Sequence, residues 1–334
     1  MNNRPKISVA VITYNQQDTL AQTLDSILCQ KGDFDLEVVI GEDGSTDGTL
    51  AICREYVERY PDQVILLSGQ NNMGIIGNSA RTARACTGNY YNIIGGDDYW
   101  CDEYKLDKQM RFLQEHPKYG AVSTNGFRLF VKSGEMVEGL PPDPPSLDGD
   151  IRKFYYDRYG GVYAMPLTLM VRAELMNYVD WDEFVRLDFP VEDYPMQCVL
   201  AHHTRFGYIP DKTAVYRVSG QSATFIGYDH PRYLAYHRGL AEIRRYLHGL
   251  FPEDVPFTEE WASEYVFYKE FLWHLHKGQL KDARKVVLDA PQIIRSELHF
   301  LLSKKVVSSW PVFQCFRIYK RIQEHKDFKE RTER

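Results

Sequence analysis

Short apolar runs rich in β-branched residues alternate with helical patterns over the first third of the chain. The first run, residues 7–12 (ISVAVI), is typical of a strand that is buried on both faces of a parallel sheet. Similar runs follow at 36–40, 63–67 and 90–94, and between them apolar residues recur at three- and four-residue spacing. This β-α-β-α-β-α-β order predicts an α/β fold with a doubly wound, mostly parallel sheet of the Rossmann-like kind.

Polar residues follow three of these four strands at the point where each strand ends. They are Thr13 and Asn15 after the first strand, Glu42, Asp43 and Ser45 after the second, and Asp97 and Asp98 after the fourth. Ligands of doubly wound sheets bind outside the carboxyl ends of the strands, so we predict a site there. Turn chemistry would explain any one of these clusters, but it explains their convergence less well.

The loop after the first strand lacks the usual phosphate-binding patterns. Residues 13–17 (TYNQQ) contain neither the G-x-x-x-x-G-K pattern nor the G-x-G-x-x-G pattern. A nucleotide bound at this edge would therefore be held by carboxylates and a metal ion, without a glycine-rich nest or a phosphate-binding lysine.

An ordered series of motifs resembles the inverting family-2 glycosyltransferases, which have the GT-A fold. The series spans about residues 5–225, and the order makes it more specific than any single motif. Its members are 8–15 (SVAVITYN), 27–30 (ILCQ), 38–49 (VVIGEDGSTDGT), 72–74 (NMG) and 95–98 (GGDD).

The resemblance implies a nucleoside pocket at the first two strand ends. It assigns contacts with the base and ribose to Val11, Thr13 and Asn15. Asp43 would accept a hydrogen bond from a base N–H, for which the imide of uracil is a suitable partner. Asn78 would face the same pocket, or it is an amide on the surface of a helix.

The resemblance also implies a divalent cation, Mg²⁺ or Mn²⁺, at the GGDD motif. Asp97 would contact the ribose or the metal and Asp98 the metal, through the oxygen ligands that these cations prefer. Two family positions differ in this chain, because Gly95 replaces an acid and Ser219 replaces a histidine. Arg217 is predicted to clamp the donor phosphates, and the alternative is an ordinary surface ion-pair partner.

The motif Glu192–Asp193 resembles the family's acidic pair at the start of a helix. Inverting transfer needs a base that takes the proton of the acceptor hydroxyl, and the resemblance assigns this role to Asp193. Glu192 would support it by touching the acceptor or the backbone. The alternative is an acidic helix cap, which is common at such places.

The chain after Arg232 has helical patterns rich in aromatic residues. We predict a GT-A domain over residues 1–230 and a helical C-terminal module over 231–334. The aromatic stripe from Trp261 to Trp273 is more typical of a helix core than of a carbohydrate platform. Such a module would cover the catalytic domain, form a homodimer or contact a membrane.

The charge is unevenly distributed along the chain. From Arg295 onward there are ten Lys or Arg residues against five acids, whereas the whole chain has a net charge of −6. The net charge argues against nucleic acid as a partner. The basic tail predicts either peripheral contact with an anionic membrane or an amphipathic helix packed on the protein.

The cysteine pattern and the hydropathy favour a cytoplasmic protein, which the basic tail would place at the inner face of the membrane. The six cysteines have no C-x-x-C spacing, which favours reduced thiols over a disulfide framework or a zinc site. No apolar run approaches the roughly 20 residues of a membrane span, and we expect no secretory leader.

These patterns predict an inverting glycosyltransferase that moves a hexosyl or N-acetylhexosaminyl group from a nucleotide-sugar donor, by preference a UDP-sugar. The acceptor would be a glycan or a lipid-linked saccharide in bacterial surface-polysaccharide synthesis. Two alternatives stay open. One is a sugar-1-phosphate nucleotidyltransferase, which would need a glycine-rich loop carrying arginine or lysine after the first strand. The other is a binding or scaffold module that kept the fold, which Gly95 and Ser219 favour.

Overall fold

The computed structural model describes residues 4–69, 71–140, 149–150, 152, 164–219 and 230–289. The chain divides into two compact units, Met1–Gln221 and Ser222–Arg334. The basic tail after Arg295 lies outside the described residues, and so do both alternatives for it.

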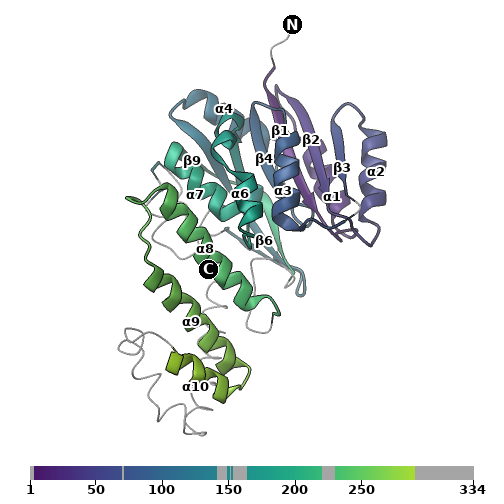
Figure 1. Cartoon of the computed structure of the whole chain (residues 1–334). Helices are drawn as coiled ribbons and strands as arrows, with labels where there is room; N and C mark the ends of the chain where they lie inside the picture. The colour runs from purple at the N-terminus through teal and green to yellow at the C-terminus, as the bar shows by residue number, and fades with distance from the viewer. Residues whose placement is uncertain are drawn as a thin grey trace. The chain divides into compact units, whose positions relative to one another are not determined.

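The described strands of the first unit form one nine-stranded mixed sheet in the order β3-β2-β1-β4-β8-β6-β9-β5, with β7 paired to β6 (Figure 1). Four strands pair in parallel, as the apolar runs predict: β1 (Lys6–Thr13), β2 (Asp35–Glu42), β3 (Val64–Ser68) and β4 (Tyr90–Gly95). The helices between them are α1 (Leu20–Leu28), α2 (Thr49–Arg59) and α3 (Gly74–Ala85). The α/β prediction is confirmed.

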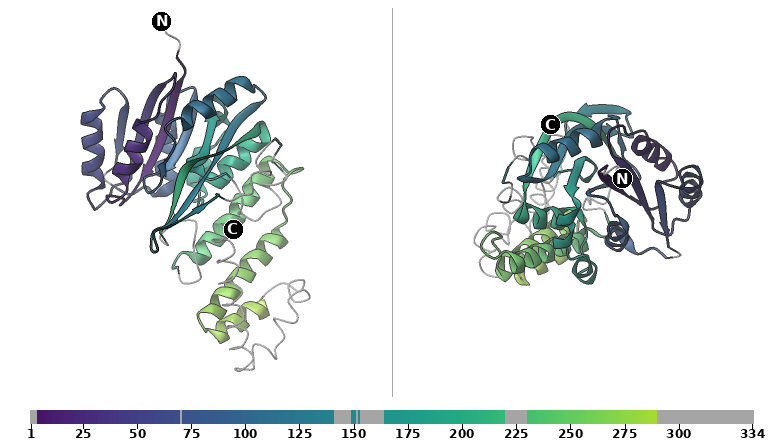
Figure 2. Two further views of the ribbon diagram at one scale, coloured as in Figure 1. Left: turned by 180° about the vertical axis from the view of Figure 1, so that it is seen from behind. Right: turned by 90° about the horizontal axis from the view of Figure 1, so that it is seen from above.

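Side-chain alternation along β1 explains why helices lie on both faces of this half of the sheet (Figure 2). Val9 and its odd-numbered neighbours pack in the main core against α1, whose Leu20, Leu24 and Ile27 form a fully buried stripe. Ala10 faces the other side, where Ala83 of α3 packs. The sequence of the β1 strand therefore buries both of its faces.

The rest of the first unit adds antiparallel pairings to this parallel half. Its elements are β5 (Tyr99–Trp100), α4 (Lys105–Glu115), β6 (Tyr119–Phe130), β7 (Glu135–Glu138), η2 (Pro166–Thr168), β8 (Leu169–Arg172), η3 (Ala173–Tyr178), α6 (Trp181–Arg186), α7 (Asp193–His203) and β9 (Arg205–Val218). Strand β8 runs antiparallel to both β4 and β6, whereas β6 and β9 are parallel with irregular register. The mixed pairing brings the start of α7 and the end of β9 into the same unit as the first strand ends.

A buried carboxylate ties the amino ends of β1 and β2 together. Glu37 is 4% exposed and accepts hydrogen bonds from Lys6, Ser8 and Thr87. Burial alone would raise its pKa, but these donors outweigh burial and hold the pKa below its ordinary value. The cluster is a structural anchor at the edge of the sheet opposite the polar strand ends.

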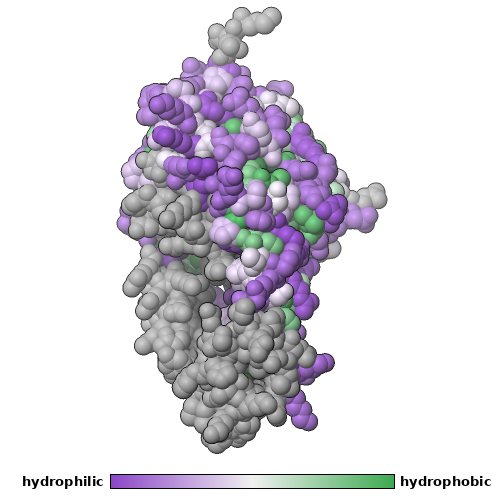
Figure 3. Space-filling model, turned by 60° about the vertical axis from the view of Figure 1, so that its left-hand side comes forward, coloured by the Kyte–Doolittle hydropathy of each residue, from purple (hydrophilic) through white to green (hydrophobic). Residues whose placement is uncertain are grey.

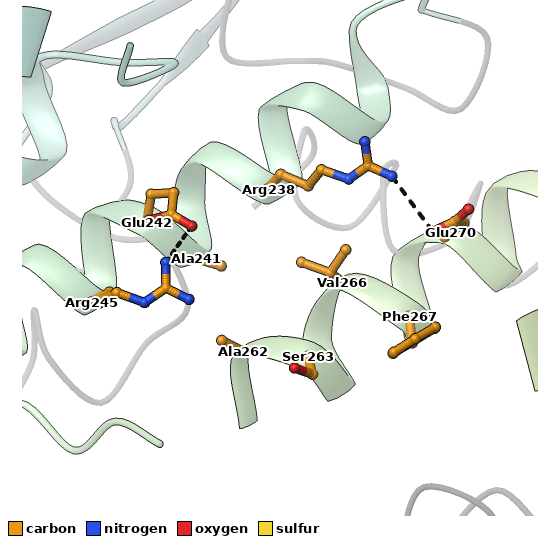
Figure 4. A pocket seen from close by; sticks show the side chains of 9 residues that line it. All are labelled: Arg238, Ala241, Glu242, Arg245, Ala262, Ser263, Val266, Phe267 and Glu270. Carbon is orange, nitrogen blue, oxygen red and sulfur yellow. Dashed lines mark hydrogen bonds and ion pairs between the residues drawn. The ribbon is translucent and has the colours of Figure 1, made fainter. Parts of the chain in front are cut away.

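The second unit is helical over its described residues, as predicted. It contains α8 (Tyr233–Leu250), α9 (Glu259–His276) and α10 (Leu280–Asp289). A groove of about 310 Å³ is lined by α8 and α9 (Figure 4). Its arginines are paired, Arg245 with Glu242 and Glu259, and Arg238 with Glu270 at 3.7 Å. The pairs Arg245–Glu259 and Arg238–Glu270 link the two helices, whereas Arg245–Glu242 lies within α8.

The aromatic residues of α9 pack as is usual for a helix in a globular fold. Phe271 is buried, and Trp261 stacks on Tyr265 with ring centroids 5.5 Å apart.

On the face drawn in Figure 3 hydrophilic residues dominate the described surface of the first unit, and apolar ones form small patches. In the described helices we find none whose length and hydropathy would suit a membrane crossing.

Candidate active site

The strand register brings the predicted polar clusters to one edge of the sheet. Thr13 at the end of β1 pairs with Glu42 at the end of β2, and Ile12 pairs with Gly95 at the end of β4. The loops that carry Asp43 and Asp97 therefore start side by side. This convergence is the arrangement that the sequence predicts for ligand binding at a parallel sheet.

Asn15 joins the first loop to the second. Its backbone N–H donates to Ser45 Oγ at 3.0 Å, and its side-chain Oδ1 accepts from the Thr46 N–H at 2.8 Å. Asn15 has a φ of 52°, a left-handed conformation that asparagine tolerates better than most residues. The residue is exposed, and its predicted contact with the nucleoside stays a prediction.

Asp43 is held in place from two sides. Its Oδ1 accepts from the Met73 N–H at 2.8 Å, and its own N–H donates to the Thr13 carbonyl at 3.1 Å. Burial raises the pKa of Asp43, although the Met73 N–H and the charge of Arg81 oppose the shift. The 72–74 motif thus has a visible function, because it orients the carboxylate of the second loop.

Two residues with predicted nucleoside contacts have side chains that are buried inside the fold. The side chain of Val11 is 0% exposed and belongs to the main core, because it follows the odd-numbered, helix-facing alternation of β1. Asn78 is 1% exposed, so it is not an amide on the helix surface either. Its Nδ2 donates to the Gly41 carbonyl at 2.7 Å, and its Oδ1 accepts from Arg81 Nε at 2.9 Å. Both side chains support the strand ends from within the fold.

The turn after β4 carries the two adjacent acids and is held by α1. Thr19 and Thr23 donate from Oγ1 to the Gly96 carbonyl at 2.8 and 3.0 Å, and Thr23 also reaches the Asp98 carbonyl at 2.6 Å. The role of these threonines was not predicted from the sequence. The signal was their spacing, since Thr19, Thr23 and Ser26 form a polar row on a helix face that is otherwise apolar.

The two glycines of the turn leave room for neighbouring polar groups. A Cβ atom on Gly96 would lie 2.5 Å from Gln16 Oε1 and 2.8 Å from Thr13 Oγ1. A Cβ atom on Gly95 would lie 2.6 Å from Asp97 Oδ1. The carboxylate of Asp97 therefore lies against the position where the family usually has an acidic side chain.

Arg217 in β9 holds the same turn from the other side. Its N–H donates to Asp98 Oδ1 at 2.8 Å, and its guanidinium donates to the Asp97 carbonyl and to Gln22 Oε1. The guanidinium also lies over the Tyr99 ring, 4.6 Å from the centroid. At 8% exposure Arg217 is not a surface ion-pair partner. Its terminal nitrogens bind protein oxygens and support the turn, and the predicted phosphate clamp stays a prediction.

Burial is the main influence on the ionisation of the two acids of the turn. Burial raises the pKa of Asp98 well above its ordinary value, and the charge of Asp97 adds to the shift. Burial also raises the pKa of Asp97, against the opposing effects of Arg217 and Gln16. An added positive charge at this turn would lower both pKa values.

Comparisons with known proteins agree with this arrangement. Residues 8–137 match the family model described as glycosyl transferase family 2. The chain is 34% identical over 225 residues to EpsE of Bacillus subtilis, a provisionally assigned glycosyltransferase, and covers 77% of that protein with 67% of its own length.

The chain belongs to glycosyltransferase family 2. It is also 30% identical over 173 residues to TuaG of Bacillus subtilis, a glycosyltransferase provisionally assigned to teichuronic acid biosynthesis, with 52% of this chain and 64% of TuaG covered. It spans only 39% of the length of the mycobacterial relatives that it matches. The crystal structure of S. aureus TarS residues 1–349 with UDP-GlcNAc has a similar fold, with a TM-score of 0.56, 15% identity, and coverage of 96% of this chain and 92% of that chain.

The turn residues of this family-2 glycosyltransferase fit a hard divalent cation. Asp97 and Asp98 offer the oxygen donors that Mg²⁺ and Mn²⁺ prefer, and burial raises the pKa of both. Throughout the described part of the chain, no three His, Cys, Asp or Glu side chains are grouped closely enough to hold a metal. A cation here would need further ligands from the donor phosphates or from water, which is common for Mg²⁺. Ser219, the residue after β9, stands where the family usually has histidine.

The predicted catalytic pair lies at the start of α7. Glu192 and Asp193 are 7% and 8% exposed, and Asp193 Oδ1 accepts from the Tyr194 N–H at 2.7 Å. The Glu192 side chain makes no capping hydrogen bond to the described helix, which argues against a plain acidic cap. Burial raises the pKa of Glu192, and the charge of Asp193 adds to the shift.

Proposed function

We propose that the protein is an inverting glycosyltransferase that transfers a sugar from a UDP-sugar to a glycan or a lipid-linked saccharide. One observation carries the proposal: the loops that carry Asp43, Asp97 and Asp98 begin at the carboxyl ends of β2 and β4, the two strands that flank β1, in a member of glycosyltransferase family 2. The UDP-GlcNAc complex of TarS, which shares the fold, supports a uridine nucleotide and a hexosyl or N-acetylhexosaminyl group.

The donor would be bound by residues of the first two loops and the turn. Asp43 would accept from the imide N–H of uracil with the oxygen that Met73 does not occupy. Thr13 and Asn15 would contact the ribose, and Thr13 Oγ1 is buried without a partner among the described residues. Asp97 would lie near the ribose or the cation, and Asp98 would be a cation ligand.

A bound Mg²⁺ or Mn²⁺ would act as a Lewis acid that stabilises the diphosphate leaving group. The residues of this chain would do the remaining work. Thr19, Thr23 and Arg217 hold the acidic turn in a fixed geometry, which preserves the position of its carboxylates during the reaction. The fixed turn is why we expect the site to tolerate the loss of the family acid at Gly95.

Asp193 would act as the general base. The acceptor hydroxyl attacks the anomeric carbon as the bond to the diphosphate breaks, and its proton passes to the Asp193 carboxylate. The N-terminus of α7 favours a negative charge at this place, which keeps the base ionised. Glu192, with its raised pKa, would be a protonated donor to the acceptor or a neighbouring oxygen.

The names of the relatives guide the biological setting. TuaG is provisionally assigned to teichuronic acid biosynthesis, and we propose synthesis of a cell-surface polysaccharide for this protein. We also propose that it works in the cytoplasm at the inner face of the membrane, with a GT-A domain over 1–230 and a helical module over 231–334. The module would cover the catalytic domain, form a homodimer or contact the membrane.

A scaffold function is the second candidate, because Gly95 and Ser219 remove two groups that the family usually has. Calorimetric titration of UDP with and without Mn²⁺, followed by a mass-spectrometric screen of nucleotide sugars, separates the two. The proposal expects UDP binding that Mn²⁺ strengthens and release of UDP from one donor. Absence of UDP binding contradicts it. Binding without hydrolysis or transfer favours the scaffold.

A further inference from the structure

Lys105 is a fully buried lysine that the proposed chemistry does not use. It lies in the first turn of α4, and its side chain is 0% exposed. Nζ donates to Gln109 Oε1 at 2.6 Å and lies 4.3 Å from the centroid of the Trp100 ring. Lysine is almost never fully buried without a charged partner, because removing an ammonium group from water is costly. Its retention here suggests a specific function.

Lys105 and two backbone carbonyls favour the same orientation of the Gln109 amide. Oε1 accepts from Lys105, and Nε2 donates to the carbonyls of Val122 at 3.0 Å and of Thr168 at 2.8 Å. A flipped amide would place its oxygen against the two carbonyl oxygens and its NH2 group against Nζ, so Lys105 adds to the preference for this orientation and holds the Gln109 side chain in place. Gln109 is itself 0% exposed.

The segment 164–168 is fixed by buried side chains from three elements. Each contributes one donor to one carbonyl: Trp100 Nε1 of β5 to Leu167 at 2.8 Å, Gln109 Nε2 of α4 to Thr168 at 2.8 Å, and Gln197 Nε2 of α7 to Ala164 at 2.8 Å. Lys105 contacts two of these three donors. The segment 164–168 therefore forms a bridge between α7 and the Lys105 cluster, which consists of Lys105, Trp100 and Gln109.

The bridge connects the two acidic motifs. At one end, Trp100 is two residues after Asp98 in the chain. At the other end, Gln197 lies one helical turn after Asp193, on the same side of α7. A chain of buried polar contacts thus runs from the donor-side turn to the proposed base.

We propose that Lys105 is a positioning residue which, through Trp100 and Gln109, sets the place of the 164–168 segment and hence of Asp193 relative to the Asp97–Asp98 turn. The proposal rests on the proposed function of these acids. The turn has its own supports in Thr19, Thr23 and Arg217. Loss of Lys105 should therefore disturb the acceptor side and leave the donor side in place.

The test compares Lys105→Met with Lys108→Met, a matched substitution on the same helix. Lys108 is 38% exposed and pairs with Asp102 and Asp211 at the surface. At a temperature where circular dichroism shows all proteins folded, Lys105→Met should lower kcat by about 10- to 100-fold, the effect of a small misplacement of a catalytic group. The donor KM and the affinity for UDP should stay within about threefold of wild type. Lys108→Met should change none of these values.

Hydrogen exchange gives a readout that does not require activity. The amides at the start of α7, those of residues 193, 194, 196 and 197, should exchange several-fold faster in Lys105→Met than in Lys108→Met. If the wild type transfers no sugar, the proposed function fails, and this exchange experiment still decides the positioning claim. A lower Tm with unchanged kcat and unchanged exchange in α7 would overturn the proposal, because Lys105 would then serve stability alone.

Gln197→Leu tests the same path should Lys105→Met not fold. It removes the donor to the Ala164 carbonyl and leaves Lys105, Trp100 and Gln109 in place. We expect the same pattern, a lower kcat with unchanged UDP affinity. A kcat within twofold of wild type in Gln197→Leu would overturn the proposal.

Discussion

The backbone N–H of Arg217 donates a 2.8 Å hydrogen bond to Oδ1 of Asp98, a residue 119 positions earlier in the chain. The Arg217 guanidinium then reaches past Asp98 to the Asp97 carbonyl and to Gln22. Strand β9 is thereby locked to the turn that we propose as the cation site. The geometry of that turn depends on residues far away in sequence.

Arg217→Lys should weaken UDP binding in the presence of Mn²⁺ by about tenfold, because lysine cannot bind the Asp97 carbonyl and Gln22 together. Binding of UDP without the cation should change little. Gln22→Ala removes one of the two partners and should give a smaller loss, and the double variant should resemble Arg217→Lys alone. Calorimetry measures all three. Equal losses with and without Mn²⁺ would instead favour a direct phosphate contact.

Glu37→Gln should lower the free energy of unfolding by about 2–4 kcal/mol at pH 7. The substitution removes the charge of a buried carboxylate that accepts several hydrogen bonds, so those hydrogen bonds are weakened or lost. The pKa of Glu37 is lowered in the fold, so its contribution is present above the ordinary pKa of glutamate and is lost as the pH falls through the lowered value. Urea denaturation at pH 7 and pH 3 should show the difference from wild type shrinking in acid. The control is Glu55→Gln, whose ion pair with Arg59 is exposed and should contribute less than about 0.5 kcal/mol.

Lys105 should make stability increase with pH in the neutral to alkaline range. Burial lowers its pKa from 10.5 to about 7, although the charge of Asp102 opposes the shift. Between these pH values the unfolded chain binds a proton that the folded chain does not, so the contribution of this group rises by up to about 1.4 kcal/mol per pH unit. Urea denaturation at pH 7, 8 and 9 should show wild type gaining stability relative to Lys105→Met. The free energy of unfolding of Lys108→Met should change with pH as that of wild type does. If Lys105→Met also followed the pH dependence of wild type, Lys105 would be accessible to water.

Gly95→Asp should not restore a stronger cation site, although it introduces the acid that the family usually has. A Cβ atom at this position lies 2.6 Å from Asp97 Oδ1, so the new side chain displaces Asp97 and adds a third charge to a buried pair. We expect weaker Mn²⁺-dependent UDP binding in Gly95→Asp. Gly95→Ala is the control that adds the Cβ without the charge, and it should show the steric part of the loss. Tighter Mn²⁺-dependent UDP binding in Gly95→Asp would contradict this expectation, because the Asp97 side chain would then make room for the new carboxylate at little cost.

The sequence predicted the strands and their functional edge well, because local features determine both. Apolar β-branched runs such as 7–12 identify buried strands, and parallel pairing places their ends together. The side-chain environments were harder to predict. Val11 was assigned to the pocket although the β1 alternation turns it into the core, and Asn78 binds a carbonyl 37 residues earlier. Such long-range partners leave no periodic pattern in the sequence.

Buried polar contacts between distant elements account for the other differences. The hydrogen bonds of the Arg217 guanidinium to the turn could not be predicted from the sequence, because its partners lie far away along the chain. The interactions of Lys105 and Gln109 become visible only when the 164–168 segment lies beside them. The roles of Thr13, Asp43, Asp98 and Asp193 stay predictions.

Sugar transfer by Asp193→Asn tests the central claim most directly. Removing a general base costs about 10²- to 10⁴-fold in rate, and asparagine keeps the shape of the side chain at the start of α7. With the preferred donor, the account predicts a kcat at least about 100-fold below wild type and a UDP affinity within about threefold. Asp182→Asn, at a carboxylate whose side chain is 87% exposed, should leave both values unchanged. Transfer by Asp193→Asn at a rate within tenfold of wild type would contradict the account, because another residue would then be the base.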